Sequence, residues 1–246
     1  SLQNNWDAAA TDLEKLNQTT GRSAKWFLMP WRIQGPFSGG MNRRTPLEQA
    51  TDPFVAAAEE LPGPLSDWLP IRLTADAMLD MAAFTGGANN CSCYAISRIY
   101  SVSGQRAAFL MGTGDSHRIW FNGQLIDEFF GNRPAQPDQD VVTVSLKKGW
   151  NTLLFKVHSG FGGHGFYCRL SDQPLQIARA LNRKKQFADA VVAWDKLIAD
   201  NPREKSLLAA RLQASLGAGL HERAAEDLAA LGKLVPENIS LQVNLA

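Results

Sequence analysis

The side chains best suited to contact a ligand gather in one glycine-rich stretch, HSGFGGHGFY, at residues 158–167. Its four glycines predict a pliant loop that presents His158, Phe161 and His164. An aromatic ring beside imidazoles can pack against a small ligand and hydrogen-bond to it. The alternative is a surface hairpin whose glycines serve only the geometry of the turn.

A second polar stretch, GTGDSHR, adds Asp115, His117 and Arg118. Asp115 could accept hydrogen bonds within its own turn, or it could join carbonyl oxygens in a calcium site. Loops between the strands of a sandwich commonly bind ligands, so both stretches are expected to contribute to one site. The predicted ligand-binding residues are Asp115, His117, Arg118, His158, Phe161 and His164.

Metal binding is the chemistry that three imidazoles would suggest, because His117, His158 and His164 suffice for zinc if they converge. The two loop histidines are expected to leave opposite sides of their loop, and His117 belongs to another hairpin. We therefore predict no metal site. Asp138 and Asp140 in QPDQD form another oxygen-rich stretch, for which a turn role and a calcium role both stay open.

Catalysis would need a nucleophile with its base, or two acids across a cleft. The motifs Gly-x-Ser-x-Gly and His-Glu-x-x-His do not occur in the sequence, and its carboxylates are scattered through predicted turns. The chain is therefore expected to be non-catalytic.

The elements that must position these residues are short strands. Before Asp172 the sequence alternates apolar segments of about 4 to 8 residues with Gly, Pro, Asn and Asp, which is typical of antiparallel strands. In IWFNG, the pair Asn122-Gly123 predicts a type I′ turn, since both residues tolerate positive φ. Strands are predicted at 31–33, 93–100, 107–111, 118–121, 124–127, 141–146, 151–157 and 165–170, with 141–146 and 151–157 joined as a hairpin by residues 147–149. Their pattern predicts an antiparallel jelly-roll β-sandwich.

The period of two along a strand assigns neighbouring residues to opposite faces. Ile119 and Phe121 then share one face and Trp120 the other, where we expect Trp120 to pack against apolar neighbours rather than form a platform for a sugar. Cys91 and Cys93 share a face in the same way. They are predicted to be small buried thiols, not a redox or metal pair.

Beyond Asp172 the sequence is rich in Ala and Leu and contains an internal repeat. Ala190, Trp194, Leu197 and Pro202 recur 34 residues later as Ala224, Leu228, Leu231 and Pro236. A 34-residue period with a small residue, a bulky residue four positions on and a terminating Pro resembles the tetratricopeptide repeat. The resemblance implies paired helices that contact a protein partner or pack onto the preceding domain.

The predicted fold class is therefore mainly β plus α, in three parts. Residues 1–22 are expected to be a helical lead-in from an upstream region, and residues 23–172 the jelly-roll sandwich. Residues 173–246 should hold two tetratricopeptide-like units and the start of a third.

Four segments of the first 172 residues together resemble a known family. They are WRIQGPF, RAAFLMGTGDSHRIWFNGQLID, VVTVSLKKGWNTLLFKV and GFYCRL. Their order is similar to the galactose-binding-like jelly roll of family two glycoside hydrolases and of carbohydrate-binding modules. The resemblance implies a non-catalytic domain, in some members sugar-binding and in others a support for a neighbour, often with a structural calcium. Relatives often carry two acids where this sequence has Asp115-Ser116, which separates it from their charge-dependent binding.

The charge balance limits the classes of partner. Lys and Arg number 25 against 24 acids, for a net charge of +1, so nucleic acid is not expected as a partner. No apolar run reaches the roughly 18 to 20 residues that span a bilayer, so no membrane partner is expected either. The expectation is a binding module of a larger protein, with carbohydrate as the ligand of the sandwich and protein as the partner of the helices. The alternatives are a ligand-free scaffold and an accessory domain of a glycoside hydrolase.

Overall fold

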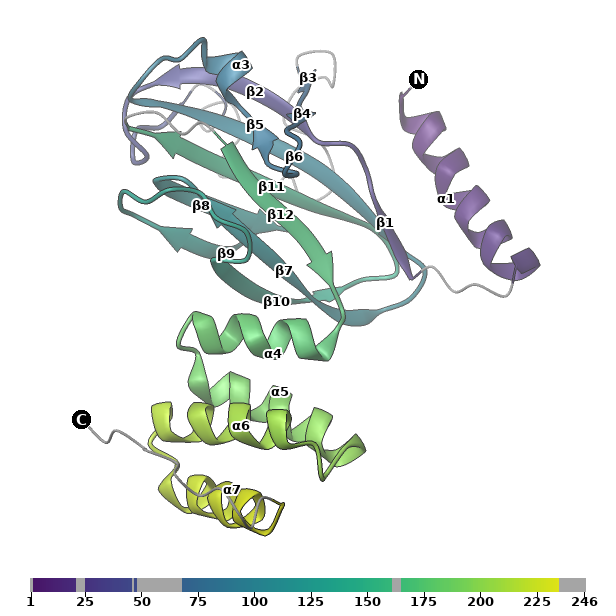
Figure 1. The fold of residues 1–246 in the computed structure, drawn as a ribbon. Helices are drawn as coiled ribbons and strands as arrows, with labels where there is room; N and C mark the ends of the chain where they lie inside the picture. Colours follow the sequence, from purple (N-terminus) through teal and green to yellow (C-terminus); the bar gives the residue numbers. More distant parts are fainter. Residues whose placement is uncertain (1, 21–24, 46, 48–67, 161–164, 235–246) are drawn as a thin grey trace.

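The computed structural model describes residues 2–20, 25–45, 47, 68–160 and 165–234. Within these ranges the chain forms two antiparallel sheets and six helices (Figure 1). The described elements are therefore mixed β and α, as the sequence predicts.

The larger sheet has seven strands in the order β3-β2-β6-β11-β8-β9, and β1 pairs with β6 beside this path. Its central strands β6 and β11 are the longest of the sheet and pair along their whole length. The bounds are β1 Trp26–Leu28, β2 Arg32–Ser38, β3 Leu69–Pro70, β6 Cys91–Ser101, β8 Ser116–Phe121, β9 Gln124–Phe129 and β11 Gly149–Ser159. The predicted strand at 31–33 thus continues past Gly35-Pro36 to Ser38.

The smaller sheet has five strands in the order β10-β7-β12-β5-β4. The bounds are β4 Arg72–Leu73, β5 Leu79–Asp80, β7 Gln105–Thr113, β10 Asp140–Leu146 and β12 Gly165–Ser171. A short helix, α3 Ala82–Thr85, lies between β5 and β6.

The two sheets pack face to face around one apolar core, which makes this part of the chain a β-sandwich. Alternate residues of strand β7 pack into two different layers, the core between the sheets and the interface with the helices. Phe109 and Met111 lie in the core between the sheets, whereas Ala108 and Leu110 face the helices on the other side. Because both faces are covered, β7 is buried on both, and its sequence is a continuous apolar run.

Four helices lie on the outer side of the smaller sheet: α4 Pro174–Arg183, α5 Phe187–Asp200, α6 Lys205–Gly217 and α7 His221–Leu234. Helix α4 lies against the sheet, and the other three stack behind it in chain order (Figure 1). Helices α5 and α7 begin 34 residues apart, at positions 187 and 221. Ala190 and Ala224, which occupy equivalent positions in them, are both buried, so small side chains stand where helices approach closely.

Ion pairs hold the last three helices together. Arg211 of α6 binds Asp227 of α7, whose side chain is 1% exposed, and also Asp195 of α5. Arg223 of α7 binds the same Asp195.

The first helix, α1 Leu2–Thr20, stands beside the end of the larger sheet (Figure 1). The Tyr100 hydroxyl donates a hydrogen bond to the Glu14 carboxylate, which joins α1 to β6. Ala10 is its buried residue within the side chains described.

The two predicted hairpins have different outcomes. At the Asn122-Gly123 turn, φ is 48° and 79°, as a two-residue turn of this kind requires, and β8 pairs with β9. The predicted hairpin of 141–146 with 151–157 is wrong. Strand β10 pairs with β7 in the smaller sheet, and β11 pairs with β6 and β8 in the larger one. The link at 147–149 carries the chain across the sandwich, because both strands have apolar inner faces that a sandwich core can bury from opposite sides.

Asn151 holds this crossing in place, and it is 1% exposed. Its Oδ1 accepts hydrogen bonds from Lys147 N at 3.0 Å and Asn122 Nδ2 at 2.9 Å. Its Nδ2 donates to Lys147 O at 2.9 Å and Gly149 O at 3.1 Å. The Asn151 side-chain amide therefore forms hydrogen bonds with backbone groups of the crossing between the sheets and with Asn122 of the β8–β9 turn.

Replacing Asn151 with Ala is expected to lower the free energy of unfolding by about 2 kcal/mol, because several buried polar groups lose their partner at once. Urea unfolding followed by circular dichroism measures this change. Asn201→Ala is the matched control, since Asn201 is exposed and its side chain makes one long bond, to Leu197 O at 3.4 Å. Equal stabilities of the two variants would contradict the role given to Asn151.

Candidate functional site

Arg118 and His158 lie on the outer face of the larger sheet. Ile119, the neighbour of Arg118 in β8, is in the core, so Arg118 points outward. His158 of β11 stands opposite Ser116 of β8 and has the same outward direction. The two predicted ligand residues therefore share one face. Arg118 lies two positions along β8 from Ser116, the residue opposite His158.

Both side chains have protein partners. Arg118 donates to Asn42 Oδ1 at 2.9 Å and to Glu128 Oε2 at 3.3 Å. The Nδ1 of His158 lies 3.2 Å from Ser92 Oγ. Burial lowers the pKa of His158, and this outweighs the Asp115 carboxylate, which acts in the opposite direction. The imidazole is therefore uncharged at neutral pH.

Asp115 fixes the start of the glycine-rich loop. Its Oδ2 accepts a hydrogen bond from Gly160 N at 2.8 Å, and its own φ is 55°. Its carboxylate thus forms a hydrogen bond outside its own turn. This bond joins the residue before β8 to the residue after β11. Phe161 and His164 lie outside the described residues.

His117 is separated from these residues. It faces the space between the sheets and is 0% exposed, because His117 and Arg118 are adjacent in one strand and point to opposite faces. His117 and His158 consequently point to opposite faces of the larger sheet, so the predicted placement of His117 in one ligand site with His158 is wrong.

The contacts of His117 have the order of a catalytic relay. Its Nδ1 lies 2.6 Å from Thr113 Oγ1, and its Nε2 lies 3.0 Å from Asp127 Oδ2. The Thr113 hydroxyl also accepts a hydrogen bond from Arg133 at 3.4 Å. We therefore assign the Thr113 hydroxyl as donor to His117 Nδ1 and His117 Nε2 as donor to Asp127, which gives each of these polar groups a partner. Thr113 is 0% exposed, and a nucleophile needs access to its substrate.

Two cations complete this buried network. Arg133 binds Asp140, and its guanidinium lies 3.9 Å from the centre of the Phe129 ring. Lys184, at the end of α4, reaches Asp127 Oδ1 at 3.3 Å and Asp140 Oδ1 at 3.7 Å. The helical layer is therefore joined to the edge of the sandwich by charge as well as by apolar packing.

The Asp127 carboxylate is stabilised in its charged form. Burial is the strongest single influence and raises its pKa, but the His117 hydrogen bond and the Lys184 charge together outweigh burial and hold the pKa below its usual value. Asp127 is thus ionised at neutral pH and pairs with cations of the protein.

Calcium does not fit these carboxylates. The ligand atoms of His117, Asp127 and Asp140 lie within 4.8 Å of one another, which is close enough for a metal. However, Arg133 and Lys184 already neutralise both acids, and calcium prefers 6–8 oxygen ligands. Asp138, the other acid of QPDQD, pairs with arginines as well.

An exposed aromatic ring extends the outer surface beside Arg118. Phe130 is 48% exposed, and the Arg118 guanidinium lies 5.2 Å from the centre of its ring. We call Phe130, Arg118 and His158 the outer platform. Phe130 was not among the predicted residues, and its sequence signal is the Phe-Phe-Gly run that follows the β9 strand.

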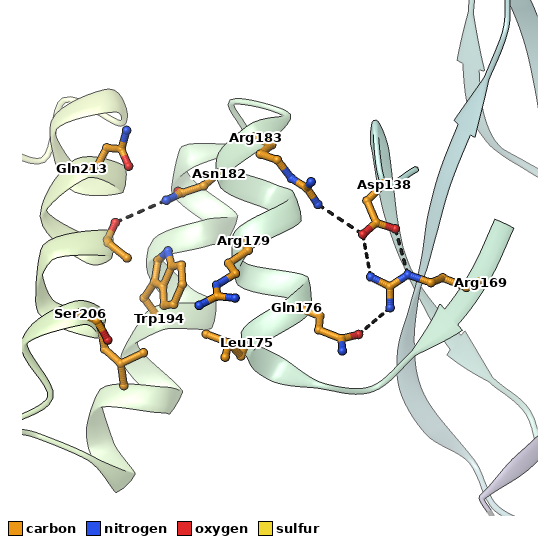
Figure 2. A pocket seen from close by; sticks show the side chains of 12 residues that line it. Asp138, Arg169, Leu175, Gln176, Arg179, Asn182, Arg183, Trp194, Ser206 and Gln213 are labelled. Carbon is orange, nitrogen blue, oxygen red and sulfur yellow. Dashed lines mark hydrogen bonds and ion pairs between the residues drawn. The ribbon is translucent and has the colours of Figure 1, made fainter. Parts of the chain in front are cut away.

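A cleft lies on the other side of the sandwich, between the smaller sheet and helices α4, α5 and α6 (Figure 2). Its volume is about 560 Å³. We call it the arginine cleft; it is lined by Asp138, Arg169, Leu175, Gln176, Arg179, Asn182, Arg183, Trp194, Ser206, Leu207, Ala210 and Gln213.

The charges of the arginine cleft are unequal. Its lining contains three arginines, Arg169, Arg179 and Arg183, and one acid, Asp138. Arg169 donates to both oxygens of Asp138, at 2.9 and 2.7 Å, and these hydrogen bonds, with the positive charge of Arg169, lower the pKa of Asp138. Three guanidinium groups against one carboxylate leave two positive charges in excess.

The sequence carries only a weak signal for this cleft. Arg179 and Arg183 are four residues apart on a predicted helix and so share a face. From the sequence, Trp194 is the bulky residue of the repeat, and Asp138 has a turn role or a calcium role. Their proximity depends on contacts between elements far apart in the chain.

None of the helices in the described part of the chain is long and apolar enough to cross a membrane.

Comparison with known proteins gives remote structural likenesses. No family model matches the sequence, and no curated protein matches it. The fold is similar to part of a β-glucosidase from Kluyveromyces marxianus in complex with glucose, at 15% identity and a TM-score of 0.36, over 63% of this chain and 18% of that chain. A β-glucuronidase from Faecalibacterium prausnitzii matches at 12% identity and a TM-score of 0.33, over 56% and 22%. A β-glucuronidase from Bifidobacterium dentium, complexed with coumarin-3-O-glucuronide, matches at 14% identity and a TM-score of 0.34, over 56% of this chain and 21% of that chain. The chain spans about a fifth of the length of these enzymes, and no residue role is carried over from them.

Proposed function

We propose that this chain is a non-catalytic binding module. In this proposal the sandwich is a jelly roll that binds carbohydrate, and helices α4 to α7 are tetratricopeptide-like units that contact a protein partner. What supports a non-catalytic role is that the one relay-like arrangement described, Thr113 with His117 and Asp127, is closed to solvent. Burial also raises the pKa of the Cys93 thiol to about 12, so this thiol stays protonated.

The observation that carries the carbohydrate proposal is the outer platform. A sugar ring has an apolar face of C–H groups and a rim of hydroxyls. The exposed Phe130 ring can pack against the apolar face, while Arg118 and His158 offer polar groups to the hydroxyls. Asp115 stabilises this surface, because its carboxylate accepts a hydrogen bond from Gly160 N, two residues after His158.

The proposal predicts that Phe130→Ala weakens binding of any sugar that the chain selects from a glycan array. We expect a loss of about tenfold in affinity, because an aromatic contact contributes on the order of 1.5 kcal/mol. Isothermal titration with the selected sugar measures the change. Leu125→Ala is the matched control, since Leu125 of β9 is 50% exposed and lies outside the platform.

Three results discriminate among the alternatives. Unchanged affinity in Phe130→Ala would move the sugar site away from the platform. Failure of every glycan on the array to bind would favour the ligand-free scaffold. A catalytic glycoside hydrolase domain in the same full-length polypeptide would favour the accessory role.

A further inference from the structure

The arginine cleft is a second candidate for a ligand, independent of the outer platform. It lies across the sandwich from the platform and draws its walls from β12, α4, α5 and α6. Its volume of about 560 Å³ falls within the range of small-molecule sites, roughly 300–1,000 Å³. The charges and hydrogen-bonding groups of its lining indicate what would fill it.

One group of the lining is buried without a partner. Trp194 is 2% exposed, and no protein atom among the described residues accepts a hydrogen bond from its indole Nε1–H. Trp194 is among the side chains that line the cleft (Figure 2). Buried donors are nearly always paired in folded proteins, so this donor points to an acceptor supplied from the cleft. The Oδ1 of Asn182, which also lines the cleft, lacks a protein donor within the described ranges.

Two of the three arginines of the cleft, Arg169 and Arg183, are held by Asp138. Asp138 binds Arg169 through two bonds, and Arg169 also donates to Gln176 Oε1 at 2.6 Å (Figure 2). Arg183 lies 3.4 Å from the same carboxylate through one nitrogen, which leaves its other donors for a ligand. Groups held in place by the protein lose little freedom when a ligand binds.

Arg179 is the cation that the protein leaves available. It is exposed on α4, and no ion pair or hydrogen bond of its side chain occurs within the described residues. Arg183 follows it by four residues, one turn along the same helix. The Arg183 guanidinium points toward Asp138, whereas that of Arg179 lies beside Trp194 (Figure 2). A planar carboxylate matches the paired donors of an arginine.

We propose that the arginine cleft binds a carboxylate-bearing ligand with an amide next to its acidic group. The carboxylate pairs with Arg179 and Arg183, the amide carbonyl accepts the Trp194 indole N–H, and the amide N–H donates to Asn182 Oδ1. Leu175, Leu207 and Ala210 contact its apolar carbons. This chemistry belongs both to a free N-acyl amino acid and to an acidic segment of a peptide.

The test follows the Trp194 indole signal by ¹⁵N–¹H correlation spectroscopy of the full chain, with Trp194→Phe used to assign it among the seven tryptophans. The probes are N-acetyl-glutamate and a blocked tetrapeptide with one central Glu. The neutral comparison ligands are N-acetyl-glutamine amide, in which both carboxylates are replaced by amides, and the same blocked tetrapeptide with Gln in place of Glu; inorganic phosphate is a further comparison ligand. We expect a saturable shift with one or both Glu probes and at least tenfold weaker binding of the Gln counterparts.

The arginine variants complete the test. Arg179→Gln should weaken binding about tenfold, and Arg183→Gln provides a second variant. Arg72→Gln is the control, because Arg72 is exposed on β4, at the far edge of the smaller sheet. Binding of N-acetyl-glutamate alone would identify a free metabolite-like ligand, and binding of the tetrapeptide alone a protein segment.

The proposal is overturned if neither Glu probe shifts the Trp194 signal up to about 10 mM, a range that covers even weak millimolar affinities. It is equally overturned if the Gln counterparts or phosphate act as strongly as the Glu probes, or if Arg179→Gln binds like Arg72→Gln. None of these outcomes depends on whether the outer platform binds a sugar.

Discussion

Gly112→Ala is expected to lower the free energy of unfolding by about 3 kcal/mol or more, one of the two largest effects expected here. A Cβ added at Gly112 would stand 1.6 Å from the backbone oxygen of Gln136 and 2.8 Å from its carbonyl carbon. Since these atoms belong to the backbone, the clash cannot be relieved by turning a side chain. The segment before β10 would have to move away from β7.

Urea unfolding of the purified chain measures this effect. Gly104→Ala is the matched control, because a Cβ there would come no closer than 3.8 Å, to Leu146 O, which is an ordinary contact. Neither glycine has a positive φ, so the comparison isolates the steric effect. We expect Gly104→Ala to remain within about 0.5 kcal/mol of the native chain. Equal unfolding midpoints for the two variants would refute the close approach at Gly112.

This close approach also bears on the candidate sites. The segment that crosses Gly112 continues into Asp138, which pairs with Arg169 in the arginine cleft, and into Asp140, which pairs with Arg133. If the segment moves in Gly112→Ala, the cleft should lose its ordered arginines together with stability.

The second large effect is expected for Arg133→Met, which should cost about 3 kcal/mol. Its partner Asp140 has a side chain only 6% exposed, so removal of the guanidinium leaves a buried carboxylate with Lys184 as its remaining cation. The variant also removes the bonds from Arg133 to Thr113 O at 3.2 Å and to Thr113 Oγ1 at 3.4 Å. The hydroxyl that serves His117 would then lose a donor.

A double-mutant cycle with Asp140→Asn tests whether the pair is the cause. The double variant should be less destabilised than the sum of the single variants by at least about 1 kcal/mol, because the second change removes the unpaired charge. Arg203→Met is the control, since Arg203 is exposed in the α5–α6 connection. Strict additivity, or an Arg133→Met chain as stable as the control, would show that the buried network contributes little.

Much of the local structure could be predicted because it depends on neighbours in the sequence. The period of two predicts that Ile119 and Phe121 share one face of the strand and Trp120 the other. The structure places the first two in the core and Trp120 on the outer face, where it packs against a second apolar cluster. Asn122-Gly123 specified its own turn through the backbone freedom of its residues. The 34-residue spacing of the Ala-rich segments anticipated helices α5 and α7.

The candidate site was predicted only in part. Asp115, Arg118 and His158 do meet at one end of the larger sheet, since their strands are neighbours in register. His117 was grouped with them because it is adjacent in sequence, yet a strand turns adjacent residues to opposite faces, and it lies inside. The sequence does not single out Phe130, because the exposure of a side chain depends on which other segments pack over it.

By itself the sequence determined the longer strands, the Asn122-Gly123 turn and the helices beyond Asp172, because backbone preferences and apolar periodicity act over a few residues. The tertiary structure alone decided that β10 and β11 belong to different sheets, since a Lys-Lys-Gly link suits a hairpin and a crossing equally well until the core selects between them. It alone also brought Asp138, Arg169, Arg179 and Trp194 together around the arginine cleft. The ion pairs of the cleft join residues up to 45 positions apart, Asp138 and Arg183, and their energies depend on burial and charge in space, which no short window of sequence contains.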